Sequence, residues 1–124
     1  MSRPSFWIAT LAVLVLVAVW NWIMNAAGVY GFTAPPWGAW SWWNGQLAFA
    51  VFFVFIYTKG MSGAKGEGLR YGLFLGLLWY LPGLFMDWPS AGFGASLWHT
   101  LAGILGFIIF GIAACLIYKS PKTA

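Results

Sequence analysis

The chain has 124 residues, of which 62% are hydrophobic and only 6% are charged, with six Lys or Arg against two Asp or Glu. Soluble domains contain roughly 25% charged residues, and a domain of this size buries only about 60–70% of the surface that its unfolded chain exposes. This composition excludes a cytosolic enzyme, a disordered tail and a nucleic-acid-binding domain. It predicts a protein whose solvent is lipid.

Four apolar segments, taken in chain order, have the length that a helix needs to cross a bilayer. They are Phe6–Ala27, about Trp40–Thr58, about Leu69–Met86 and about Ala95–Tyr118. Backbone groups in lipid must pair within their own segment, so we expect helices rather than open strands. The predicted fold class is all-α: a polytopic membrane protein in which residues 1–124 form a single four-transmembrane-helix bundle.

The first segment has an alternative interpretation as a signal peptide. Phe6–Trp20 follows Arg3 and resembles the apolar region of such a peptide. Cleavage after Ala27 would place Asn25 at the third position before the cut, where a small residue is preferred. We therefore expect a membrane span.

The connections between the segments are short and rich in Gly and Pro. Residues 28–39 contain Pro35 and Pro36, which stop a helix. We expect Pro82 to kink the third helix near its outer end. Residues 87–94 form the predicted connection to the fourth helix, with Pro89 as the helix breaker.

The positive charges predict the orientation. With four spans, all six Lys and Arg fall on one side of the membrane, whereas the connections on the other side have none. This positive-inside pattern predicts cytoplasmic N- and C-termini. Besides Arg3, which precedes the first span, the residues that we expect to anchor the protein to anionic headgroups are Lys59, Lys65, Arg70, Lys119 and Lys122.

Small residues in the last two segments predict close helix packing. Gly72 and Gly76 are four residues apart, the spacing that lets two membrane helices approach closely. The fourth segment adds Gly103, Gly106 and Gly111. The pattern leaves open whether these faces pack within the chain or against a second copy.

Polar side chains and most of the tryptophans gather at the outer ends of the helices. One interpretation is an interfacial belt, where water satisfies these groups. The other is a small outward-open pocket lined by amides and indoles, in which Asp87 and His99 could form a titratable pair. The residues of this predicted pocket are Asn21, Asn25, Trp43, Asn44, Gln46, Asp87, Trp98 and His99.

Metal, redox and catalytic sites find little support in the sequence. Cys115 is the single cysteine, so an internal disulfide is excluded. A zinc site needs three or four ligands, and His99 is the single histidine beside only two acids. We recognise no catalytic motif, and we expect no metal and no cofactor.

The central loop resembles a group of small uncharacterised bacterial four-helix membrane proteins. The motif that carries the resemblance is Ile56-Tyr57-x-Lys59-Gly60 followed by Glu67-Gly68-Leu69-Arg70-Tyr71-Gly72-Leu73. The resemblance implies a multi-pass protein of the bacterial inner membrane and no particular activity. Members of the group often have an Asp and a His one turn apart near the outer end of the first helix, where this chain has Asn21 and Asn25.

Three functions are compatible with this pattern. The leading hypothesis is a non-enzymatic accessory or structural subunit that packs through its glycine faces, in a homo-oligomer or a larger membrane complex. The second is an outer-leaflet binding or transport module for a small hydrophobic or aromatic ligand. The third is a cofactor-bearing subunit that uses His99. Membrane lipids are the expected partners in each case.

Overall fold

The computed structural model describes residues 3–60 and 66–118, and this part of the chain is helical apart from its connections. The predicted all-α, four-helix fold is confirmed. Lys65, Lys119 and Lys122, three of the predicted anchoring residues, lie outside the described residues. The helices are α1 (Arg3–Ala26), α2 (Trp40–Gly60), α3 (Glu67–Ala91) and α4 (Phe93–Ile117).

Three of the four helices are long and apolar enough to cross a membrane: Ser5–Ala26 of α1, Glu67–Ala91 of α3 and Phe93–Ile117 of α4. Bulky apolar side chains are exposed on all three, as lipid-facing surfaces require. Helix α2 is not among them. Its first turns contain three tryptophans, Asn44 and Gln46, which make that end of α2 less apolar than its second half.

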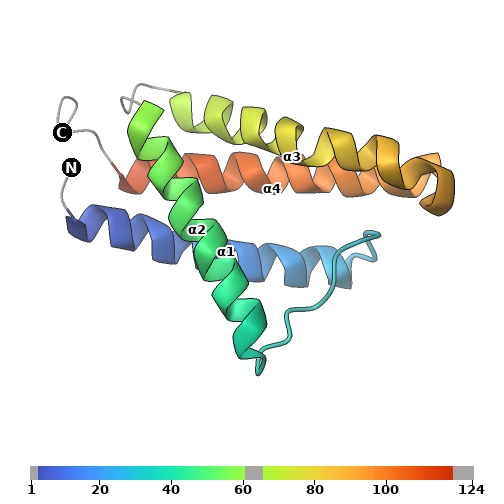
Figure 1. The fold of residues 1–124 in the computed structure, drawn as a ribbon, viewed down its shortest axis with the longest axis horizontal. Helices are drawn as coiled ribbons and strands as arrows, with labels where there is room; N and C mark the ends of the chain where they lie inside the picture. Colours follow the sequence, from blue (N-terminus) through green and yellow to red (C-terminus); the bar gives the residue numbers. More distant parts are fainter. Residues whose placement is uncertain (1–2, 61–65, 119–124) are drawn as a thin grey trace.

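Helices α1, α3 and α4 run side by side, whereas α2 crosses α1 obliquely (Figure 1). The start of α1, the end of α2, the start of α3 and the end of α4 lie at one end of the molecule. This end therefore includes the helix turns that contain Lys59 and Arg70. The turn between α3 and α4 lies at the opposite end. The first turn of α2 stands away from the other helices.

Helices α3 and α4 pack backbone against backbone along a stripe of glycines. A Cβ atom added to Gly72 would overlap the backbone of Phe107 and Ile108. One added to Gly111 would overlap the backbone of Gly68 and Gly72. The glycine faces of these two helices therefore pack against each other within the chain, which answers the question that the sequence left open.

The connection between α3 and α4 is much shorter than the predicted loop over residues 87–94. Helix α3 continues through both Pro82 and Pro89 to Ala91, and Gly92 alone separates it from α4. A proline removes one backbone donor, and membrane helices tolerate this loss through small local adjustments. Gly92 makes the turn because its φ of +91° lies in a region that other residues rarely adopt.

The core lies toward the end of the molecule where α2 meets α3. Phe53 and Tyr57 of α2 are buried against Tyr71 of α3, with ring centroids 5.0 and 5.1 Å apart. The Tyr71 hydroxyl donates a hydrogen bond to the backbone carbonyl of Phe53. Phe107 and Phe110 of α4 complete this aromatic core. It fixes the second half of α2 to the α3–α4 pair.

The glycine contacts between α3 and α4 can be tested with two Gly→Ala substitutions in α3. We expect Gly72→Ala to lower the free energy of unfolding by about 1–3 kcal/mol, because the added methyl group has only backbone to displace. Gly83→Ala is the control, since a Cβ there meets nothing within 4 Å. The measurement is unfolding in mixed micelles followed by circular dichroism. Equal destabilisation by the two substitutions would contradict the packing described here.

Candidate functional site

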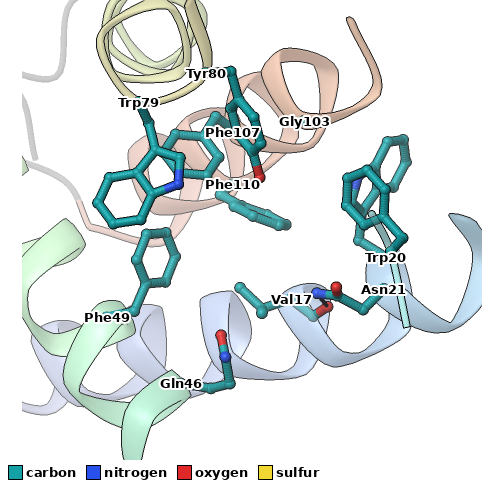
Figure 2. A pocket seen from close by; sticks show the side chains of 11 residues that line it. Val17, Trp20, Asn21, Gln46, Phe49, Trp79, Tyr80, Gly103, Phe107 and Phe110 are labelled. Atoms are coloured by element: carbon teal, nitrogen blue, oxygen red, sulfur yellow. Dashed lines mark hydrogen bonds between the residues drawn. The ribbon is translucent and has the colours of Figure 1, made fainter. Parts of the chain in front are cut away.

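A cavity of about 200 Å³ lies between the four helices, away from the end where α2 meets α3 (Figure 2). The later part of α1, the first half of α2 and the middle parts of α3 and α4 surround it. Its lining residues are Val17, Trp20, Asn21, Phe32, Gln46, Phe49, Trp79, Tyr80, Gly103, Phe107 and Phe110. None of them is charged, and most are aromatic.

Three helices each contribute one uncharged polar side chain to this cavity. They are Asn21 of α1, Gln46 of α2 and Tyr80 of α3. Figure 2 shows the Tyr80 hydroxyl and the Gln46 amide directed into the cavity. Among the described residues, neither side chain makes a hydrogen bond, and Asn21 uses only its Nδ2 atom, which donates to the Val17 carbonyl at 2.9 Å. The cavity thus presents both donors and acceptors.

Tyr80 occupies its position because of the glycine stripe. It follows Gly72 and Gly76 at the same spacing of four residues, so all three lie on the face of α3 that meets α4. The Tyr80 ring lies directly over Gly103, where a Cβ would overlap it. Tyr80 lines the cavity but is not among the residues that the sequence predicted for the pocket. Its spacing from the two glycines, opposite a further glycine, was the signal that could have identified it.

Trp20 holds α1 against α4 beside the cavity. Its ring lies over Gly106, where a Cβ would overlap the indole. Its Nε1 atom donates a hydrogen bond to the backbone carbonyl of Ala102 at 3.1 Å. Gly103 and Gly106 therefore receive aromatic rings from α3 and α1, and they offer no flat face to another helix.

His99 and Asn25 position the connection between α1 and α2. The His99 Nδ1 atom lies 2.8 Å from the carbonyl oxygen of Tyr30, and its ring packs against the backbone of Gly31. Asn25 donates through Nδ2 to the carbonyl of Phe32 at 3.0 Å. Phe32 is buried and lines the cavity. These two polar side chains thus hold the ring that closes one side of the cavity.

The other predicted pocket residues lie outside the cavity. Trp43 donates to the carbonyl of Trp37 and so stabilises the start of α2. Asn44 is exposed, and the Trp98 side chain is 67% exposed. No hydrogen bond or ion pair joins Asp87 to His99 in the described ranges. Nor do the residues of these ranges include a group of three side chains that could hold a metal ion.

The contact between His99 and Gly31 can be tested by comparing Gly31→Ala with Gly28→Ala. Gly28 and Gly31 both have positive φ, so Ala at either position costs about 1–2 kcal/mol. Only at Gly31 would the new Cβ also displace the His99 ring. We expect Gly31→Ala to speed modification of the single histidine by diethylpyrocarbonate, and Gly28→Ala to leave this rate unchanged. Equal rates in the two variants would argue against the contact.

Comparison with family models, with curated proteins and with solved structures found no match for the chain. The resemblance of the central loop to small bacterial four-helix membrane proteins stays a prediction. The chemistry of the cavity is the guide to function.

Proposed function

We propose that the chain is an integral membrane protein that binds a small uncharged ligand in the cavity between its helices. The observation that carries this proposal is the convergence of Asn21, Gln46 and Tyr80, from three different helices, on a space that is otherwise aromatic. Ligand sites have this character: apolar walls that supply contact area, and a few polar groups that fix orientation. Polar side chains that only form a belt at the membrane interface need not point into one common space.

The size and charge of the cavity define the ligand class. An apolar cavity of about 150 Å³ holds benzene, so about 200 Å³ accommodates one substituted ring or a compact aliphatic group. A buried ion without an opposite charge is unfavourable, and no lining residue is charged. The preferred ligand is therefore neutral, with an apolar body and a group that donates and accepts hydrogen bonds.

The proposed membrane orientation places the cavity near the middle of α3 and α4, with Asn21 on its outer side. Lys59 and Arg70 are exposed at the end where α2 meets α3, and the positive-inside rule assigns this end to the cytoplasm. Asn21 lies near the opposite end of α1, whereas Tyr80 and Phe107 lie near the middle of α3 and α4. The proposal includes cytoplasmic termini and a bacterial inner membrane.

A binding role is favoured over an accessory subunit because of how the glycines are used. The accessory hypothesis rested on glycine faces that could pack against another chain. In the structure, Gly72, Gly76 and Gly111 pack between α3 and α4, whereas Gly103 and Gly106 receive Tyr80 and Trp20. The faces that motivated the accessory role are therefore occupied within this chain.

A binding titration tests the cavity. The probe is 4-bromophenol, whose bromine quenches tryptophan fluorescence and whose hydroxyl can bond to Gln46 and Tyr80. We expect 4-bromophenol to quench the tryptophan fluorescence of the protein in mild detergent, and the quenching to saturate as the probe concentration rises. Gln46→Leu or Tyr80→Phe removes one hydrogen bond of about 0.5–1.5 kcal/mol, which raises Kd roughly twofold to tenfold.

The control for this titration is Asn44→Leu, two residues from Gln46 on the same helix but exposed and outside the cavity. It should bind the probe like the unchanged protein. If all three variants keep the same Kd, or if quenching never saturates, the cavity is not the binding site.

The proposed orientation has its own test. In a Cys115→Ala background, we expect Ser90→Cys to react with a membrane-impermeant maleimide added to intact cells. Ser90 is exposed near the turn between α3 and α4. Gly60→Cys, at the opposite end, should react only after the cells are opened. The reverse labelling pattern would overturn the orientation.

A further inference from the structure

A second hollow lies between α2 and α3, and its lining is entirely apolar. It measures about 400 Å³ and has Phe52 and Ile56 of α2 on one side and Leu75 and Leu78 of α3 on the other. Phe52, Ile56 and Leu78 are exposed at the surface of the molecule. The hollow is therefore a groove, the α2–α3 groove, that opens onto the side of the molecule between these two helices.

The α2–α3 groove shares walls with the polar cavity. Phe49, Trp79 and Phe107 line both spaces. In Figure 2, the Phe49 and Trp79 side chains come from α2 and α3 to the same side of the cavity, and both rings pack against Phe107, with centroid distances of 5.4 and 6.4 Å. These three side chains therefore form the wall between the two spaces, and a molecule that occupies both would have to displace Phe49 or Trp79.

The two spaces differ sharply in chemistry. The cavity presents the amides of Asn21 and Gln46 and the hydroxyl of Tyr80, whereas the α2–α3 groove presents only hydrocarbon and aromatic surface. A polar compartment that adjoins a larger apolar one is complementary to a molecule with one polar end and one hydrocarbon tail. The absence of a charged residue from either lining restricts the polar end to an uncharged group.

We infer that the ligand is a single-chain, uncharged amphiphile, such as a long-chain alcohol, a primary amide or a monoacylglycerol. Its polar end bonds to Gln46 and Tyr80 in the cavity, and its hydrocarbon chain lies in the α2–α3 groove. This inference rests on the proposed function and names the ligand class of the same site. The side opening lets the ligand enter from the lipid without crossing water.

Two other occupants fit the dimensions and chemistry less well. A helix from another protein is about 10–12 Å across with its side chains, which is too wide for a groove of about 400 Å³. A fatty-acid carboxylate or a phospholipid phosphate would bring a negative charge to the cavity, where no described lining residue can neutralise it.

The experiment uses a long-chain primary alcohol with a photoreactive diazirine near the end of its chain. The full-length protein in lipid nanodiscs is irradiated with the probe, and the attachment sites are mapped by mass spectrometry. We expect attachment to Phe52, Ile56, Leu75 or Leu78. We expect Gln46→Leu to reduce the yield about twofold to tenfold, the effect of one lost hydrogen bond, and Asn44→Leu to leave it unchanged.

A second pair of variants tests the path of the chain. Leu78→Phe adds bulk inside the groove, whereas Leu77→Phe adds the same bulk to the neighbouring residue, which does not line it. Leu78→Phe should lower the attachment yield of the long-chain alcohol and leave the Kd of 4-bromophenol unchanged. Leu77→Phe should change neither. This pattern would place the chain in the groove and the polar end in the cavity.

Other outcomes overturn the inference and can be separated from failure of the proposed function. Attachment spread over all exposed helix faces, or groove attachment that is insensitive to Gln46→Leu, would mean that ordinary lipid fills the groove. If 4-bromophenol still binds in the cavity, the proposed function stands and only the amphiphile is wrong. If neither 4-bromophenol nor the alcohol depends on Gln46 and Tyr80, both proposals fail.

Discussion

The close contact between the backbones of α3 and α4 determines most of the remaining architecture. Gly72 and Gly111 allow the two helices to approach until only backbone lies between them. Lipid gives apolar helices no hydrophobic reason to associate, so van der Waals contact of this kind is the main source of attraction. The pair then acts as a rigid wall. It presents Gly103 and Gly106 as recesses, and the rings of Tyr80 and Trp20 fill them.

The cavity and the groove are consequences of how α2 meets this wall. The aromatic core around Phe53 and Tyr71 fixes the second half of α2 to α3. Its first half diverges, because α2 runs obliquely to the other helices (Figure 1). The diverging part opens the space that Phe32, held by Asn25 and His99, closes from the side of the α1–α2 connection. Hydrogen bonds to the connection therefore determine the shape of a cavity that they do not line.

Much of the helix arrangement could be predicted from the sequence, but its details depended on contacts between distant segments. The helical class follows from the length of the apolar segments, and the spacing of Gly72 and Gly76 indicates close packing but not which helix they meet. The direction of α2 does not follow from the sequence, because its apolar and aromatic residues cover all its faces. Gln46 lines the cavity and Asn44 is exposed, although they are two residues apart. Only the rotation of α2 about its axis distinguishes them, and no local pattern fixes that rotation. Pro89 predicted a loop, but it lies within α3. The sequence around a proline does not show whether the packed helix tolerates it, because that depends on the neighbouring helices.

The single residue between α3 and α4 has a consequence for how this protein can change over evolution. With Gly92 as the whole connection, the rotation of α4 about its own axis is tied to that of α3. Each helical residue turns the chain by about 100°, so one inserted residue would swing Gly103 and Gly111 away from α3. Length changes are therefore excluded at this turn, whereas the 13-residue connection between α1 and α2 (27–39) can absorb them.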